Sequence, residues 1–155
     1  MSRNPRFLSS MFKLYVRPHM EYCVEMWNPM FRGDIDKMER VQNKMTRLLR
    51  DSHLRSPESR NNLLGITTHK IRRLRGDLIN IYKYIEKGQI FTLSEDGRTR
   101  GNDKKILRPT CQSTIKRHSF SFRSVDEWNK LPNSVVNCRT LNDFKCNVDM
   151  YLLNM

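Results

Sequence analysis

Residues 34–50 read DIDKMERVQNKMTRLLR, and their hydrophobic pattern decides the fold class. The apolar side chains recur at intervals of three and four, which is the repeat of one face of an α-helix. They are Ile35, Met38, Val41, Met45, Leu48 and Leu49. Asp34 is the expected N-cap, and Asp36 suits the positive end of the helix dipole. Capping explains both aspartates, so we predict a helix over 34–51 and no metal site.

Comparable spacing predicts helices before this segment. A helix over residues 7–17 is expected to break or kink at Pro18, because the residue preceding a proline disfavours the helical region. A second helix restarts with Pro18 in its first turn and runs to Trp27. The start of the chain lacks acidic residues and has the composition of a mitochondrial presequence, but a helix of the folded domain is the preferred interpretation.

Further helices are predicted after it, each with a recognisable capping residue. The caps and stops are Ser56 and Gly65 for residues 57–64, Thr67 or Thr68 for a long helix to about Lys87, and Thr140 for the last helix. The chain contains no alanine and is 37% hydrophobic. Its helices must therefore depend on the packing of apolar faces more than on intrinsic propensity.

Residues 118–136, HSFSFRSVDEWNKLPNSVV, combine aromatic and basic side chains and raise two alternatives. Phe122, Val125, Trp128 and Leu131 share a helical face that ends at Pro132. These side chains could stack on nucleic-acid bases, but aromatic residues at helical spacing are more often part of a core. We predict that they are buried and that Lys116 and Arg123 are available to a ligand.

Residues 88–117 lack a sustained repeat and contain three glycines and a proline. This composition predicts a long basic arm that includes a brief extended piece at Ile106 and Leu107. The predicted fold class is all-α, with five to six helices and this arm. The expected domains are a helical region at 1–87, the arm at 88–117, and a C-terminal helical pair at 118–155 that packs back on the bundle.

The net charge of the 155-residue chain is +13, and the excess is concentrated in two blocks. Residues 37–75 hold 11 Lys/Arg against 3 Asp/Glu, and residues 98–123 hold 8 against 1. Such concentration indicates a polyanionic partner, since binding to phosphates releases their counterions. A basic surface that serves only solubility is the alternative.

The basic residues form three predicted groups. The first is a ridge on the 34–51 helix: Lys37, Arg40, Lys44 and Arg47. The second lies at the start of the long helix, where positive charge opposes the helix dipole: Lys70, Arg72, Arg73 and Arg75. The third follows the arm and its end: Arg98, Arg100, Lys104, Lys105, Arg108, Lys116 and Arg123. These residues are expected to contact phosphates without reading bases.

Catalytic and cofactor motifs are lacking in this sequence. There is no GxxxxGK[ST], GxGxxG or HExxH motif, and the four cysteines show neither zinc spacing nor a disulfide framework. His19 and Cys23 are spaced i, i+4, which is common by chance. Arg75-Gly76-Asp77 lies inside a predicted helix and is rejected as an integrin ligand. We therefore predict no catalysis, no cofactor, no membrane partner and an intracellular protein of the nucleus or cytoplasm.

Several segments resemble, in sequence and in order, the region downstream of the polymerase core in Jockey-like LINE reverse transcriptases, which are encoded by non-LTR retrotransposons. They are LYVRPHMEYCVEMWNP (14–29), DIDKMERVQNKMTRLLR (34–50), HKIRRLRGDLINIYKYI (69–85), RTRG (98–101), FSFRSVDEWNKLPNSVV (120–136) and TLNDFK (140–145). Each is a weak signal alone, and the series is specific. The likeness covers nearly the whole chain.

The resemblance implies a thumb-like helical bundle from an RNA-directed DNA polymerase, in contact with an RNA, DNA or RNA–DNA hybrid template-primer. The family's aspartate-bearing palm motif has no counterpart here, so this chain alone is expected to be non-catalytic. The resemblance also leaves an alternative open: an inert structural remnant that packs on a missing polymerase palm.

Overall fold

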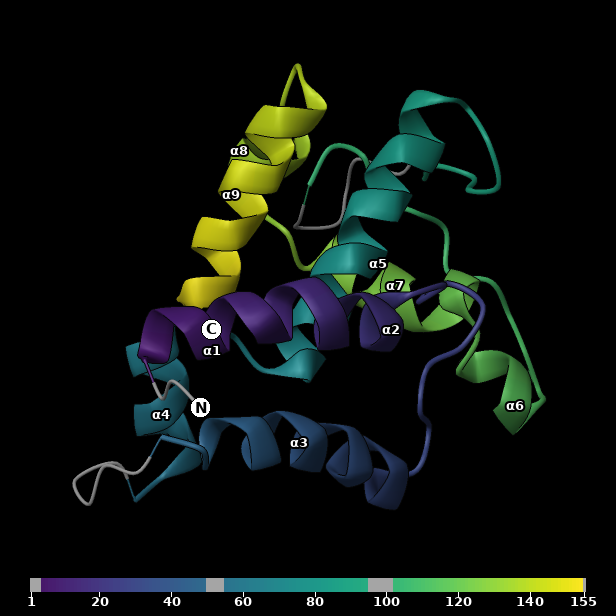
Figure 1. Cartoon of the computed structure of the whole chain (residues 1–155). Coiled ribbons are helices and arrows are strands. Elements are labelled where there is room, and N and C mark those ends of the chain that lie inside the picture. Colours follow the sequence, from purple (N-terminus) through teal and green to yellow (C-terminus); the bar gives the residue numbers. More distant parts are fainter. Residues whose placement is uncertain (1–3, 50–54, 95–101, 155) are drawn as a thin grey trace. The chain divides into compact units, whose positions relative to one another are not determined.

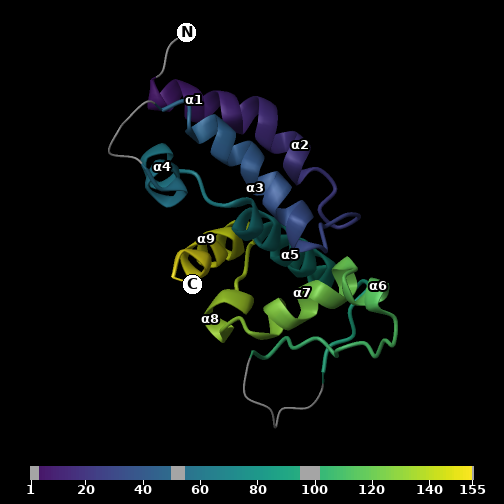
Figure 2. The same cartoon turned by 90° about the horizontal axis from the view of Figure 1, so that it is seen from below.

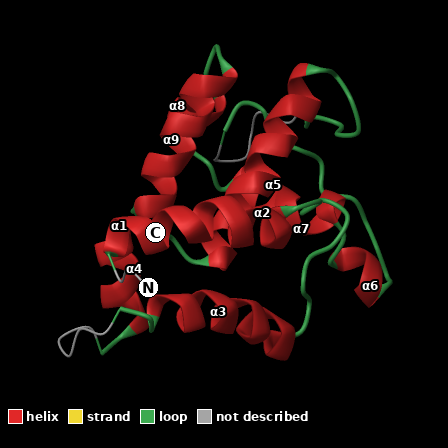
Figure 3. Ribbon diagram, viewed as in Figure 1, coloured by secondary structure: helices red, strands yellow, loops and turns green. Residues whose placement is uncertain are grey.

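The computed structural model describes residues 4–49, 55–94 and 102–154 (Figure 1). In these ranges the chain is helical and contains no β-strand, which confirms the all-α prediction (Figure 3). Two compact units are present: Met1–Cys23 with Pro29–Arg73, and Val24–Asn28 with Leu74–Met155. The division falls inside helix α5 (His69–Glu86), whereas the sequence predicted a boundary after residue 87.

Among the described residues, the first unit contains five helical elements before α5, and the first three of them join end to end as a continuous rod (Figure 2). They are the rod of α1 (Pro5–Met11), π-helix η1 (Phe12–Val16) and α2 (Arg17–Glu21), then α3 (Arg32–Thr46) and α4 (Pro57–Leu64). The sequence predicted a break or kink at Pro18, and the helical rod continues through this residue without a break. A proline has no N–H to donate, and the wider π-turn, in which the Arg17 N–H reaches the Phe12 carbonyl, carries the helix past it.

Two other predicted boundaries in this unit are also wrong. Helix α2 ends at Glu21 instead of Trp27, because Tyr22 is extended and Cys23 has a φ of 49°. Helix α3 begins at Arg32 after an extended Phe31, so Asp34 lies in its first turn rather than at the N-cap. The Asp34 carboxylate instead accepts a hydrogen bond from Lys37 Nζ at 2.8 Å.

The ends of α4 agree with the sequence prediction. The Ser56 hydroxyl accepts the Ser59 N–H at 3.1 Å, and Pro57 occupies the first turn. Gly65 ends the helix with a φ of 57°, a left-handed conformation that costs glycine little. This turn directs Ile66 back toward the core.

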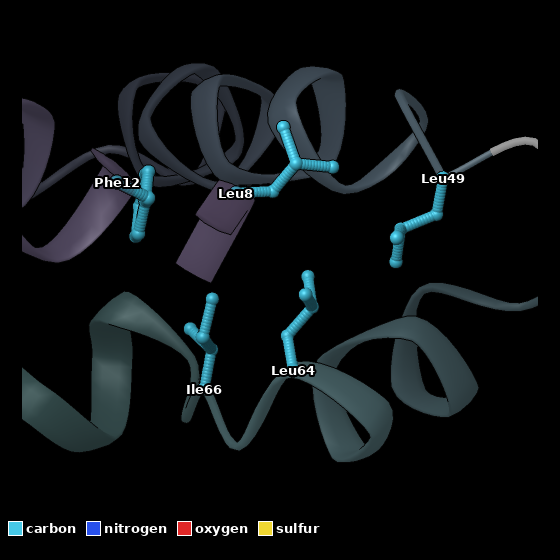
Figure 4. Close-up of a cluster of buried hydrophobic side chains, with 5 residues drawn as sticks. All are labelled: Leu8, Phe12, Leu49, Leu64 and Ile66. Atoms are coloured by element: carbon cyan, nitrogen blue, oxygen red, sulfur yellow. The ribbon is translucent and has the colours of Figure 1, made fainter. Parts of the chain in front are cut away.

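The apolar core of the first unit joins α1 and η1 to α4 and the end of α3 (Figure 4). Its buried members are Leu8, Phe12, Leu49, Leu64 and Ile66, with Val16 and Met45 packed against them. Full burial of such side chains contributes about 1.5–3 kcal/mol each. A core of this size needs polar support.

Buried polar residues supply that support between α3 and α4. Gln42 is 1% exposed and its amide donates to Asn61 Oδ1 at 3.2 Å. Arg60 is 5% exposed and donates to Thr46 Oγ1 at 3.1 Å and to the Arg55 carbonyl at 2.8 Å. These hydrogen bonds offset the desolvation of groups that an apolar core would exclude.

His69, at the start of α5, is buried against Phe12 with ring centroids 6.1 Å apart. Among the described residues, neither ring nitrogen has a hydrogen-bond partner. Burial lowers the pKa of His69 to about 4; Arg17, Arg73 and Arg72 act in the same direction, and Glu21 opposes them. The imidazole is therefore neutral at physiological pH.

The second unit contains residues 24–28, most of α5, and four later helices. These are α6 (Thr114–Arg117), α7 (Phe120–Asn129), α8 (Asn133–Val136) and α9 (Leu141–Leu153). The Thr140 hydroxyl caps α9 by accepting the Asp143 N–H at 3.1 Å, as predicted. In its core, Phe144 stacks on Tyr82 with centroids 4.3 Å apart and contacts Trp128 at 5.7 Å.

The aromatic stretch of α7 packs largely as predicted. Val125, Trp128 and Leu131 are no more than 1% exposed, so they form core and are not available for stacking. Phe122 is different, because it is only half-buried. Its ring lies at the surface of the second unit.

The middle of the predicted basic arm packs on α7 instead of extending from the fold. Asn102 is buried and donates to the Trp128 and Leu131 carbonyls, at 3.0 and 3.2 Å. The Trp128 Nε1–H in turn donates a hydrogen bond to the Lys104 carbonyl at 2.8 Å. The brief extended piece is confirmed at Ile106, which forms an antiparallel bridge with Leu93.

We expect His69 to make the stability of the first unit depend on pH. The unfolded chain binds this proton near pH 6.5 and the folded chain near pH 4, so stability is complete above about pH 6.5 and is lost as the pH falls toward 4. At pH 5 the loss relative to pH 8 should be about 2 kcal/mol. Chemical denaturation at both pH values measures it.

The substitution His69→Leu should abolish the part of the pH dependence of stability that comes from His69. Burial raises the pKa of the neighbouring Glu39, so Glu39 changes the stability with pH in the opposite direction to His69. Because Glu39 is present in both proteins, the effect of His69 is measured as the difference between the pH profiles of wild type and variant. His19→Gln, which removes an exposed imidazole, is the control. Equal pH profiles for wild type and His69→Leu would contradict the assignment.

Candidate nucleic-acid interface

The predicted cationic ridge lies on the exposed side of α3. Lys37, Arg40, Lys44 and Arg47 are all exposed. At 100° per residue they fall within one sector of the helix, opposite the buried Gln42. From Lys37 to Arg47 there are ten residue steps, so the ridge extends about 15 Å along the helix axis.

The charges of this ridge are largely uncompensated. Within the described ranges Lys37 alone of the four forms an ion pair, with Asp34, and their side chains are 72% and 49% exposed. A pair this exposed is weak and exchanges readily. No carboxylate in the described ranges pairs with Arg40, Lys44 or Arg47. Three of the four cations can thus meet an external anion without first breaking an ion pair.

The second predicted group, at the start of α5, is arranged differently. Lys70 is exposed, but Arg72 donates from Nε and Nη2 to the two Glu21 oxygens, at 2.9 and 2.8 Å. Arg73 is 5% exposed and donates to the Met20 carbonyl at 2.7 Å. These arginines fasten α2 to α5 within the first unit. Arg72 and Arg73 therefore stabilise the fold, and their guanidinium groups do not form an accessible phosphate-binding cluster with Lys70.

Arg75 and Arg123 have the same kind of role in the second unit. Arg75 pairs with both carboxylate oxygens of Asp149, joining α5 to α9. Arg123 donates to both oxygens of Asp77 at 3.0 and 2.9 Å, and also to the Val24 carbonyl at 2.7 Å. A carboxylate that binds the guanidinium in this bidentate way occupies the geometry a phosphate would need. This corrects the expectation that Arg123 is available to a ligand.

The remaining predicted cations vary in their surroundings. Lys104 pairs with Glu86 at 2.9 Å, and Arg108 pairs with Asp126 at 3.1 Å. Lys105 is half-buried, and Lys116 is exposed on α6. Arg98 and Arg100 lie outside the described residues. The structure thus leaves α3 as the best-defined group of accessible cations.

Several exposed cations were not singled out from the sequence. Lys83, Lys87 and Arg139 surround a cavity of about 270 Å³ beside Tyr82 in the second unit. The i, i+4 spacing of the two lysines, one on α5 and one directly after it, was a signal that could have identified them. Arg117, beside Lys116, was also missed.

Within the parts of the chain that the structure describes, no three His, Cys, Asp or Glu side chains converge as metal ligands. Cys23, Cys111, Cys138 and Cys146 are free thiols. No described helix combines the length and apolar character needed to cross a bilayer.

The pairing of Arg123 with Asp77 predicts that substitution of Arg123 lowers the stability of the second unit strongly. The two side chains are 14% and 6% exposed, so Arg123→Gln leaves a buried carboxylate without its main partner. We expect the free energy of unfolding to fall by about 3 kcal/mol. Arg139→Gln, which removes an exposed charge in the same unit, should change it by less than about 0.5 kcal/mol. Equal stability of the two variants in urea denaturation would exclude this role for Arg123.

The comparisons with known proteins leave the family open. No protein-family model matches the chain, and the searches of curated proteins and solved structures found no match. The resemblance to LINE reverse transcriptases therefore depends on the segments quoted above.

Proposed function

We propose that the chain is a non-catalytic nucleic-acid-binding module, derived from the thumb and downstream region of a LINE reverse transcriptase, that holds a template-primer through its phosphates. The observation that carries the proposal is the ridge of Lys37, Arg40, Lys44 and Arg47 on α3. The retrotransposon origin is supported by the ordered series of motifs in the sequence.

The dimensions of the ridge suit a phosphate backbone. One strand of a duplex presents a phosphate about every 3.4 Å along the axis, so a 15 Å ridge faces about four of them. The side chains are long, exposed and carried by a regular helix. Contacts of this kind position a nucleic acid without selecting its sequence.

The ridge consists of two lysines and two arginines and contains no aromatic residue, and the neighbouring Asn43 of α3 is half-buried. Gln42, the one glutamine of α3, is buried and bound to Asn61. Base-edge readout requires such side chains to enter a groove, whereas exposed lysines and arginines in a row along one helix face are suited to the phosphate backbone. We therefore expect similar affinities for duplexes of different sequence and a strong dependence on salt.

The salt dependence of binding tests the ridge directly. If four phosphates are neutralised, the slope of log K against log salt should be near −3.6 for a duplex. The triple variant Arg40→Gln, Lys44→Gln, Arg47→Gln should flatten that slope by about 2.7, because three counterion-releasing contacts are lost. Fluorescence anisotropy with a labelled duplex at several salt concentrations measures it.

A matched control comes from the same unit. The triple variant Arg6→Gln, Lys13→Gln, Arg32→Gln also removes two arginines and one lysine, all exposed and outside the ridge. Its slope should stay within one unit of wild type. If both variants flatten the slope equally, the effect follows net charge, and the ridge is not the binding site.

A second candidate function is a structural remnant that packs on a missing palm, and the apolar surface of α1 and η1 favours it. Phe7, Met11, Leu14 and Tyr15 recur at helical spacing and are 47%, 40%, 67% and 63% exposed. Contiguous exposed apolar side chains often mark an interface. This candidate is favoured if the chain self-associates independently of salt and fails to bind RNA, DNA and hybrid duplexes. Nucleotide incorporation by the chain alone would contradict both candidates.

A further inference from the structure

A cavity of about 560 Å³ lies in the second unit, between the segment that precedes α6 and the exposed side of α7. Its volume is in the range of small-molecule sites. The side chains that matter for its chemistry are Arg108, Cys111, Arg117, Phe122, Arg123 and Asp126. None of them belongs to the ridge on α3, so this is a separate site.

The charges around the cavity favour an anionic ligand. Three arginines line it against one carboxylate. Asp126 pairs with Arg108 at 3.1 Å, and Arg123 is held by Asp77, which lies outside the lining. Among the described residues, no carboxylate pairs with Arg117. One exposed positive charge, that of Arg117, therefore remains uncompensated among the residues that line the cavity.

The Arg117 side chain contacts the segment that precedes α6. Its Nε donates a long, exposed hydrogen bond to the Cys111 carbonyl at 3.4 Å, which leaves the two Nη groups available to a ligand. The planar guanidinium is well suited to bind a phosphate through two parallel hydrogen bonds. Arg108 can add a second contact, because its ion pair with Asp126 is exposed and therefore weak.

Phe122 supplies the apolar part of the cavity. It departs from its buried neighbours on α7, being half-buried and part of the cavity lining. An aromatic ring beside a cationic anchor is the combination on which a nucleobase stacks while its phosphate is bound. We propose that this cavity binds a single nucleotide, with the phosphate on Arg117 and Arg108 and the base against Phe122.

Binding of AMP to the whole chain, measured by isothermal titration calorimetry, tests the proposal. Adenosine and inorganic phosphate, each offering half of the ligand, should bind at least about tenfold more weakly than AMP. Arg117→Gln should weaken AMP binding at least about tenfold, because a charge-assisted hydrogen bond is lost. Lys116→Gln, the adjacent residue of α6 that does not line the cavity, should leave the affinity unchanged. Equal effects of the two substitutions would overturn the proposal.

The thiol of Cys111 gives a second readout that needs no variant. Bound AMP should slow the alkylation of Cys111 and leave that of Cys146, an exposed thiol on α9, unchanged. Phe122→Leu should reduce the preference for AMP over ribose 5-phosphate. If saturating AMP protects neither thiol or protects both equally, the cavity is not the site.

The source of the nucleotide is resolved by competition. An oligonucleotide with a 5′-phosphate that displaces AMP better than its 5′-hydroxyl counterpart identifies the end of a chain as the ligand. If neither oligonucleotide displaces AMP, the ligand is a free nucleotide. Either result is consistent with nucleotide binding in the cavity. The triple α3 variant should bind AMP normally, so loss of the ridge and loss of the cavity are separable.

Discussion

The pairing of arginine with carboxylate decides which parts of this basic chain remain available to a partner. Arg72 with Glu21, Arg75 with Asp149 and Arg123 with Asp77 are bidentate pairs between different elements. They supplement a core that is lean in apolar residues. Arginines used in this way contribute to the fold, and a net charge of +13 therefore overstates the charge that is accessible.

The same pairs account for the unusual start of α5. Positive charge near a helix N-terminus opposes the dipole, and the sequence suggested that function required it there. In the structure, acidic partners face two of these arginines, and Glu39 accepts the Lys70 N–H at 3.2 Å. The local conflict is thus resolved by residues from other helices.

The functional proposals depend on cations that lack such partners. The α3 ridge projects away from the buried Gln42, so its positive charges remain in solvent. Arg117 lines a cavity and donates a long hydrogen bond to a backbone carbonyl. The first arrangement suits an extended phosphate backbone, and the second suits a single phosphate. The two sites belong to different units and can be tested separately.

The sequence by itself determined the helical class, the capping of α4 and α9, and the burial of Val125, Trp128 and Leu131, because these follow from local spacing and local hydrogen bonds. It also identified the α3 ridge, since helical periodicity separates its charged and apolar faces. Only the tertiary structure decided which arginines are paired, because their carboxylates lie up to 74 positions away. The packing of Asn102 on α7 and the cavity beside Arg117 likewise arise from contacts between distant segments, which no local pattern records.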